Sequence, residues 1–320
     1  MTAEGFGAPQ GGAPKKPDLS VELCGVRLRT PVLAASGCFG FGREMAGWVD
    51  LAALGGVVTK SVSLEPRRGR PTPRMAETPS GMLNAIGLQN PGVEAFCAGD
   101  LPFLAEAGAT VVASLFGGSA EEFGRLAARL ADEPAQLLEL NLSCPNVDHR
   151  GELFASDPGM AATVVRTVKA AARQPVLAKL TADVTDLVAV ARAVVEAGAD
   201  GLVLINTLLG MAVDVHRRRP RLASVTGGLS GPAIRPVAVR CVWQVATALP
   251  GVPIVGTGGV ATAEDAAELL LVGATAVAVG TASFVNPRAA VEVAAGLEGY
   301  LAAQGVGSVA ELPALFKAER

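Results

Sequence analysis

Short apolar runs recur along the whole chain, and segments with helical periodicity separate most of them. An apolar run bounded by turn residues is typical of a buried strand, whereas apolar residues spaced three and four apart are typical of a helix. Their alternation predicts repeated βα units, and eight such units predict a closed parallel barrel. The eight runs are Val32–Ser36, Gly56–Val62, Thr110–Leu115, Leu137–Ser143, Val176–Thr181, Gly201–Thr207, Pro253–Thr257 and Ala276–Thr281.

Three of the intervening segments carry helix end signals, either acidic residues in the first turn or a glycine after the last. They are Ser119–Leu130, Asp186–Ala197 and Ala263–Leu271. The alternative architecture, an open doubly wound sheet, requires a G-x-G-x-x-G turn after its first strand. The glycines of residues 37–42 stand in a different order. We therefore predict an α/β protein with the TIM (β/α)8 barrel fold.

Two connections are longer than a barrel needs, and both are rich in Pro, Gly or Arg. These are Ser63–Pro91 and Leu208–Gly231, which we interpret as functional insertions at the C-terminal mouth, with a small hairpin. Residues 1–17 are rich in Gly, Pro and Ala, as is typical of a flexible tail. We expect a single barrel domain over residues 18–320. Active sites of this fold lie in the loops that follow the strands.

Composition narrows the classes of protein that remain. Half of the 320 residues are hydrophobic and 18% are charged, which argues against disorder. The 27 basic and 30 acidic residues form no long basic stripe, so nucleic acid is not the expected partner. The sequence has neither a signal-like apolar segment nor an 18-residue apolar stretch, and its five cysteines are widely spaced. We expect a cytoplasmic protein without a membrane segment, a zinc site or an iron–sulfur cluster of its own.

The most informative motif is Asn141-Leu-Ser-Cys-Pro-Asn146, at the end of the fourth run. It places Cys144 at the barrel mouth between two carboxamides, where the thiol can act as a general base or as a nucleophile. A structural buried thiol is the alternative, and it is the expected role of the other four cysteines. A pair of Cys144 with His149 stays open, although a histidine in a polar loop is usually solvated.

Two glycine turns follow the last two predicted strands, Val255-Gly-Thr-Gly-Gly259 and Val279-Gly-Thr-Ala282. In barrels these positions form a phosphate cradle of backbone N–H groups with a helix N-terminus behind it. Glycines that serve only tight turns are the alternative. The pair of turns on consecutive strands favours a ligand that bears a phosphate.

Lysines and asparagines also gather at predicted strand ends. Lys60 and Lys179 could stabilise the negative charge of a reduced flavin, form a Schiff base as in barrel aldolases, or stand in solvent. The asparagines offer the donor and acceptor pairs that a planar ring with amide groups needs, although single asparagines more often cap helices or form turns. They are Asn84, Asn90, Asn141, Asn146 and Asn206.

These motifs together resemble the dihydroorotate dehydrogenase family, and in particular its class 1B, NAD-linked catalytic subunits. They occur in family order from about Leu19 onward. They are Ser80-Gly-Met-Leu-Asn-Ala-Ile-Gly-Leu-Gln-Asn-Pro-Gly92, Asn141-Leu-Ser-Cys-Pro-Asn146, Ile205-Asn-Thr207, Thr226-Gly-Gly-Leu-Ser-Gly-Pro-Ala233, Gly256-Thr-Gly-Gly259 and Val279-Gly-Thr281.

The resemblance implies one FMN per chain and the oxidation of dihydroorotate to orotate in pyrimidine synthesis. Cys144 would take the C5 proton while the C6 hydride goes to the flavin. The implied substrate contacts are Lys60, Asn84, Ala85, Ile86, Gly87, Leu88, Asn141, Asn206 and Thr207. The implied flavin contacts are Ser36, Lys60, Ser61, Ser114, Asn141, Lys179, Ile205 and Gly231, with the phosphate on Gly258, Gly259, Gly280 and Thr281.

Class membership sets the implied electron acceptor. Class 1B implies an electron-transfer subunit that carries FAD and a 2Fe–2S cluster, with a homodimer of catalytic subunits at the core of a heterotetramer. A fumarate-reducing class 1A enzyme is the alternative within the family, whereas the membrane-bound class 2 enzymes have serine in place of the cysteine. A lyase with a Schiff-base lysine and a non-catalytic ligand-binding barrel are the alternatives outside it. Two arginine clusters, residues 67–70 and 217–219, are more basic than the family pattern predicts.

Overall fold

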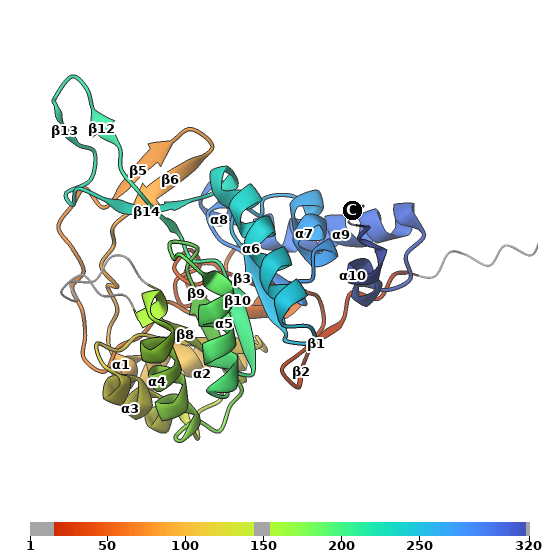
Figure 1. Ribbon diagram of the computed structural model, residues 1–320, viewed down its shortest axis with the longest axis horizontal. Coiled ribbons are helices and arrows are strands. Elements are labelled where there is room, and N and C mark those ends of the chain that lie inside the picture. The colour runs from red at the N-terminus through yellow and green to blue at the C-terminus, as the bar shows by residue number, and fades with distance from the viewer. Residues whose placement is uncertain (1–15, 144–153, 318–320) are drawn as a thin grey trace, which may run out of the picture.

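The computed structural model describes residues 16–143 and 154–317 and contains the predicted closed barrel (Figure 1). Eight parallel strands follow one another around the barrel in chain order, and the last pairs with the first. All eight predicted runs contain one of them, so the predicted fold is confirmed. The strands are β3 (Val32–Ala34), β4 (Gly56–Val58), β7 (Val111–Leu115), β8 (Leu137–Asn141), β9 (Val176–Leu180), β10 (Gly201–Leu204), β15 (Ile254–Thr257) and β16 (Ala276–Val279).

Side chains alternate between the two faces of each barrel strand. On β8, Leu138 and Leu140 pack against the surrounding helices in the large core cluster, whereas Leu137 belongs to a separate cluster inside the barrel. Two hydrophobic residues of an N-terminal hairpin, Leu23 and Leu28, join this inner cluster. The hairpin consists of β1 (Val21–Leu23) and β2 (Val26–Leu28).

The barrel interior changes from apolar to polar toward the C-terminal ends of the strands. Inner-cluster residues such as Val58, Val112, Leu137, Leu177 and Val255 lie two positions before polar residues on their own strands or just beyond them. Because the side-chain period of a strand is two, the polar residues face the same interior. They are Lys60, Ser114, Glu139, Lys179 and Thr257.

Helices surround the barrel, as Figure 1 shows. The three predicted helices are present, and each begins with a capping side chain: those of Ser119, Asp186 and Thr262 accept hydrogen bonds from the N–H groups of Glu122, Ala189 and Asp265. The α-helices of at least eight residues are α3 (Ala120–Leu130), α4 (Pro158–Lys169), α5 (Leu187–Glu196), α6 (Arg235–Ala248), α7 (Ala263–Leu271) and α9 (Ala289–Gln304). The shorter ones are α1 (Val93–Ala95), α2 (Leu101–Glu106), α8 (Ala282–Val285) and α10 (Leu312–Leu315), with a π-helix at Phe96–Asp100 and 3-10 turns at Leu51–Ala53, Phe154–Ser156, Pro232–Ile234 and Val309–Glu311.

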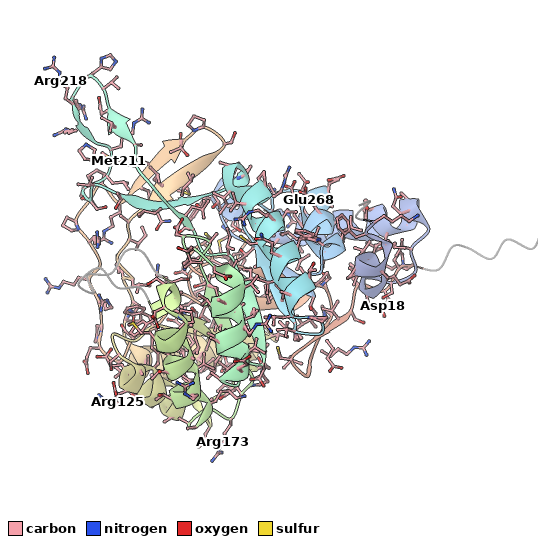
Figure 2. All side chains as sticks on the ribbon, in the orientation of Figure 1. Asp18, Arg125, Arg173, Met211, Arg218 and Glu268 are labelled. Carbon is pink, nitrogen blue, oxygen red and sulfur yellow. The ribbon has the colours of Figure 1, made fainter. Side chains whose placement is uncertain are left out.

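The two insertions pair with each other in one antiparallel sheet, in the order β11-β14-β6-β5. The first insertion supplies β5 (Met75–Thr78) and β6 (Gly81–Asn84), and the second supplies β11 (Leu208–Gly210) and β14 (Gly227–Ser230). The sequence predicted a local hairpin but not this pairing across the two insertions. A second hairpin, β12 (Val213–Asp214) and β13 (Arg219–Pro220), projects beyond the sheet with Arg218 at its tip (Figure 2).

Residues 1–15 of the expected tail lie outside the described residues. In the part of the chain that the structure describes, no helix has the length and apolar character to span a bilayer.

Candidate active site

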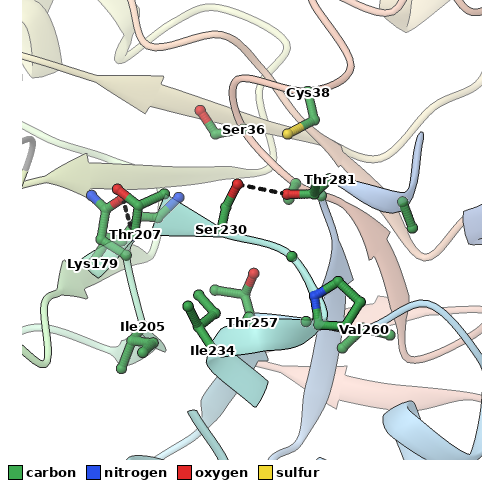
Figure 3. A pocket seen from close by; sticks show the side chains of 18 residues that line it. Ser36, Cys38, Lys179, Ile205, Thr207, Ser230, Ile234, Thr257, Val260 and Thr281 are labelled. Carbon is green, nitrogen blue, oxygen red and sulfur yellow. Dashed lines mark hydrogen bonds between the residues drawn. The ribbon is translucent and has the colours of Figure 1, made fainter. Parts of the chain in front are cut away.

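Two adjoining hollows, which we call the two lobes of one cavity, occupy the C-terminal mouth of the barrel. One lobe lies at the ends of β15 and β16, and Figure 3 shows it from close by. The other lies between the barrel and the inserted sheet and has a volume of about 330 Å³. A shared set of residues lines both lobes, so that one elongated ligand, or two ligands in contact, could occupy them. These residues are Ser36, Cys38, Lys179, Asn206, Thr207 and Ser230.

The lobe at β15 and β16 is walled by the two predicted glycine turns. Gly258 and Gly259 have φ values of +127° and +80°, and a Cβ on Gly259 would come within 2.6 Å of Arg235 Cβ. These two glycines are therefore required by the turn itself. The helix that follows the second glycine turn is α8, which has only four residues.

Gly280 differs from its neighbours in this lobe. A Cβ there would meet only Ala35 Cβ and Cys38 Sγ, both at an ordinary contact distance of 3.5 Å. Protein packing does not demand glycine at this position, and Gly280, Ala35 and Cys38 all line the cavity. The missing side chain leaves room for a ligand that approaches the backbone closely, which fits a phosphate better than a simple turn does.

The inserted sheet is joined to the glycine lobe by a hydrogen bond between side chains. Thr281 Oγ1, at the end of β16, donates to Ser230 Oγ on β14 at 2.8 Å, as Figure 3 shows. On the same strand, a Cβ on Gly228 would lie 2.2 Å from Thr207 Oγ1. The sheet therefore packs directly against the residues that line the mouth.

The lobe under the inserted sheet combines apolar and polar walls. Met75, Met82, Ile86, Leu88 and Phe284 provide apolar surface. The polar side chains that face them come from barrel strands and from the sheet, and they are Lys60, Ser61, Asn84, Asn141, Lys179, Asn206 and Thr207. A flat, amide-bearing ligand fits such a site, because the apolar walls accept its faces while the carboxamides pair with its edge.

A buried ion pair lies at the floor of this site. Lys179 Nζ is 3.5 Å from Glu139 Oε1, and the two residues are 8% and 2% exposed. Removing a charge from water is costly unless an opposite charge compensates it. The carboxylate therefore allows an ammonium group to stand inside the barrel.

Hydrogen bonds connect this ion pair to the carboxamides. Glu139 Oε1 accepts from Ser114 Oγ at 2.9 Å, Ser114 and Ser61 share a bond of 2.8 Å, and Asn141 Nδ2 donates to Ser61 Oγ at 3.1 Å. Asn206 Nδ2 lies 3.2 Å from Asn141 Oδ1 and 2.9 Å from Ser143 Oγ. Strands β4, β7, β8, β9 and β10 or the residues just after them contribute to one network.

A thiol that the sequence did not single out lies in the cavity wall. Cys38 lines both lobes, and removal of its side chain from water raises the pKa of the thiol to about 11, although Lys179 and Lys60 oppose the rise. Near neutral pH this thiol is protonated. It lacks the thiolate character that a base or nucleophile requires.

Most of the predicted site residues line this cavity. Lys60, Ser61, Asn84, Ile86, Gly87, Leu88 and Asn141 line the lobe under the sheet, and Ile205, Gly231, Gly258, Gly259, Gly280 and Thr281 line the glycine lobe, with Ser36, Lys179, Asn206 and Thr207 in both. Ala85 packs with Leu83 and Leu222 instead. Ser114 lies behind Ser61 and does not line either lobe. Cys144, Asn146 and His149 lie outside the described residues.

Several residues of the site were missed by sequence reasoning. The clearest is Glu139, the single charged residue in the apolar strand Leu137–Asn141, and this isolation was the available signal. Ser143 stands beside Cys144 in the predicted motif and is buried against β9, since its hydroxyl donates to the carbonyl of Lys179 at 3.1 Å. Cys38 carried no such signal, whereas Ser230 and Thr257 stand inside the quoted motifs of residues 226–233 and 255–259 but were not assigned a role themselves.

Comparison with known proteins identifies the same family that the sequence motifs resemble. A family model described as dihydroorotate dehydrogenase matches residues 18–301. A protein of Geotalea daltonii named "Dihydroorotate dehydrogenase B (NAD(+)), catalytic subunit" is 54% identical over 298 residues, which cover 93% of this chain and 97% of that protein. Proteins of the same name from Geobacter sulfurreducens and Alkaliphilus metalliredigens are 52% and 50% identical, and each match covers 93% of this chain and 98% of the relative. On these matches, the chain belongs to the dihydroorotate dehydrogenase family.

Proposed function

We propose that this chain oxidises dihydroorotate to orotate with a bound FMN, as the catalytic subunit of an NAD⁺-linked enzyme of pyrimidine synthesis. The observation that carries the proposal is the two-lobed cavity, in which a glycine-lined lobe adjoins a lobe walled by carboxamides and lysines. Membership of the dihydroorotate dehydrogenase family and relatives named as NAD⁺-type catalytic subunits support it.

FMN fits the residues of the glycine lobe. Gly258, Gly259, Gly280 and Thr281 would hold its phosphate, since Gly280 leaves space that protein packing does not claim. Ser36, Ile205 and Gly231 line the wall of that lobe, and Lys60, Ser61, Asn141 and Lys179 would meet the ring. Ser114 would act from behind, through Ser61. When bound, the flavin supplies the acceptor for the hydride at C6 of the substrate.

The substrate would occupy the lobe under the inserted sheet. Asn84, Asn141, Asn206 and Thr207 would pair with the ring amides of dihydroorotate, and Lys60 would neutralise its carboxylate. Ile86, Gly87 and Leu88 would close over the ring, with Ala85 contributing through its backbone because its side chain is buried elsewhere. Fixing the ring in one pose lowers the barrier, because orientation is settled before the reaction begins.

The base in this proposal is Cys144, whose thiolate takes the C5 proton while the C6 hydride leaves with its electron pair. Two described residues hold the chain just before it. Asn141 is anchored by Ser61, and the Ser143 hydroxyl is bonded to the carbonyl of Lys179. The segment that bears the base thus begins from a fixed point on the barrel.

The acceptor and the assembly are part of the same proposal. We expect electrons to pass to NAD⁺ through a partner subunit with FAD and a 2Fe–2S cluster, in a cytoplasmic heterotetramer built on a homodimer of this chain. The sequence lacks the cysteine cluster that an iron–sulfur centre would need and the glycine-rich turn that a dinucleotide would need. The Schiff-base alternative requires an uncharged amine, whereas Lys179 stands in an ion pair with Glu139.

The test is an anaerobic titration of the purified chain, followed by its visible spectrum. We expect a yellow protein that dihydroorotate bleaches, and a Cys144→Ala variant that still binds flavin and orotate but is reduced about 100-fold or more slowly near neutral pH, because the general base is lost. A protein that binds no flavin, or a flavin that dihydroorotate leaves oxidised, contradicts the proposal. Equal reduction rates in wild type and Cys144→Ala contradict the role of the cysteine alone.

A further inference from the structure

The buried carboxylate of Glu139 ends a continuous chain of side-chain hydrogen bonds that starts in the cavity. The chain runs from Asn206 to Asn141 at 3.2 Å, to Ser61 at 3.1 Å, to Ser114 at 2.8 Å and to Glu139 at 2.9 Å. Asn141, Ser61, Ser114 and Glu139 are all buried. Its members therefore have few partners other than each other.

The chemistry of Glu139 sets the direction of every bond in this chain. An ionised carboxylate can only accept, so the single hydroxyl proton of Ser114 is committed to Glu139. The Ser114 oxygen must then accept from the Ser61 hydroxyl, which leaves the Ser61 oxygen to accept from the Asn141 amide nitrogen. A chain with one acceptor-only end thus runs in one direction only.

The same constraint reaches the carboxamide of Asn141. The Nδ2 atom of Asn141 faces Ser61, so its Oδ1 atom is turned to receive Nδ2 of Asn206. Asn206 Oδ1 in turn accepts from the backbone N–H of Thr207 at 2.8 Å. Asn206 is oriented by the backbone as well, because its Nδ2 atom donates to the carbonyl oxygen of Ser143 at 3.2 Å. Asn141 therefore lies between two fixed partners, and without the carboxylate the Ser61 side no longer fixes which amide atom it receives.

Glu139 carries a second task, because the oxygen that accepts from Ser114 also lies 3.5 Å from Lys179 Nζ. Strand β8 pairs Glu139 with Leu177 and Asn141 with Lys179, so Lys179 lies two residues further toward the mouth than the partner of Glu139. The carboxylate therefore holds the ammonium in place and partly cancels its charge. One side chain links the amides of one lobe to the cation shared by both lobes.

We propose that Glu139 is a positioning residue of the active site: it holds the amide orientation of Asn141 through Ser114 and Ser61, and it sets the charge beside the flavin through Lys179. The inference rests on the proposed function. Glu139 lines neither lobe of the cavity, so its effects on the ligands would pass through Lys179 and the serines. The effect on the amides passes through Ser114, and the effect on charge passes through Lys179, so different substitutions can separate them.

The experiment compares two variants of the flavin-loaded chain by two measurements, the Kd of orotate from the shift in the flavin spectrum and the reduction potential from equilibration with a reference dye. Glu139→Gln keeps the size of the side chain but can donate as well as accept, and it removes a negative charge. Ser114→Ala breaks the chain and leaves the ion pair. Ser283→Ala is the matched control, because Ser283 is buried and its hydroxyl has no partner among the described residues.

We expect both Glu139→Gln and Ser114→Ala to weaken orotate binding about tenfold, the effect of losing roughly 1.4 kcal/mol of interaction. Only Glu139→Gln should raise the potential, because an uncompensated ammonium favours the electron-rich flavin. A tenfold change in the dye equilibrium corresponds to about 30 mV for a two-electron couple. Ser283→Ala should change neither quantity.

The contrary outcomes are distinct. Orotate Kd values that match wild type in both variants contradict the directional chain. A potential that is unchanged or lower in Glu139→Gln contradicts the charge role. Ser114→Ala tests the chain by itself if Glu139→Gln does not retain flavin. Failure of the wild-type chain to bind orotate contradicts the proposed function rather than this inference.

Discussion

At the scale of single residues, Cys38 shows why a thiol at the barrel mouth need not be a base. Cys38 follows β3 and is partly buried in the cavity wall beside Gly280, where removal from water raises its pKa to about 11. Cys144 follows an anchored serine in a polar motif. Burial alone disfavours a thiolate, so the position of a thiol in a cavity does not make it a base. A thiol base needs a neighbouring donor or cation that lowers its pKa, and for Cys38 the effect of Lys179 and Lys60 is smaller than that of burial.

The shifted pKa of Cys38 predicts how stability depends on pH. The folded state holds the thiol proton more tightly than the unfolded chain, whose thiol titrates near 9.0. Unfolding therefore releases protons between pH 9 and about 11, and the free energy of unfolding falls as the pH rises through this range. A shift of this size is worth at most about 2 to 3 kcal/mol.

Urea unfolding of the flavin-free chain at several pH values checks this prediction. Wild type should lose more stability between pH 9 and 11 than Cys38→Ala, because the variant lacks the titrating group. Below pH 8 the difference between the two proteins should not change with pH. Parallel curves across the whole range would show that Cys38 titrates normally in the folded protein.

At the scale of elements, the two glycine turns after β15 and β16 differ in what they require. The turn after β15 needs glycine for its own conformation, since Gly259 has φ near +80° and faces Arg235. The turn after β16 uses an ordinary backbone at Gly280 and leaves a space at the cavity wall. Gly259 is needed for the backbone conformation of its turn, whereas the missing side chain of Gly280 leaves space in the cavity.

Alanine substitutions at these two positions should separate stability from ligand binding. Gly259→Ala should destabilise the flavin-free chain by about 1 to 3 kcal/mol, because it combines a positive φ with a close contact. Gly280→Ala should leave the unfolding temperature almost unchanged and weaken FMN about tenfold or more, with riboflavin affected less because it has no phosphate. Thermal unfolding and fluorescence titration supply the measurements. Equal FMN affinity in Gly280→Ala and wild type would contradict a phosphate at this turn.

The barrel itself could be predicted from local sequence because each strand is a short apolar run that ends in a turn. All eight strands were predicted in this way, and the strand ends pointed to Lys60, Asn141 and Lys179. The inserted sheet could not, because pairing of β6 with β14 joins segments far apart in the chain and depends on the finished barrel. Glu139 was missed for a related reason. Its role depends on neighbours from β7 and β9, which only the closed barrel brings together.

At the scale of the whole molecule, the proposed redox site lies at the barrel mouth, and the sequence carries no dinucleotide turn that would bind a nicotinamide. In the proposed function the cavity at the mouth would hold a flavin and a flat substrate, and its walls come from the barrel and the inserted sheet. Neither a cysteine cluster nor a G-x-G-x-x-G turn occurs in the sequence. A small artificial acceptor can collect electrons at the mouth, whereas NAD⁺ needs a binding site of its own.

The prediction is that dihydroorotate oxidation and NAD⁺ reduction can be separated by subunit composition. The chain alone should reduce a small dye with dihydroorotate and should reduce NAD⁺ at least about 100-fold more slowly than a co-expressed complex, since the second site is missing. Fumarate in place of NAD⁺ tests the class 1A alternative, and Cys144→Ala in both preparations shows that the electrons come from the same site. If the chain alone reduced NAD⁺ as fast as the complex, the partner subunit would be unnecessary. If the chain alone reduced fumarate as fast as it reduced the dye, fumarate would be the physiological acceptor and the class 1A alternative would hold.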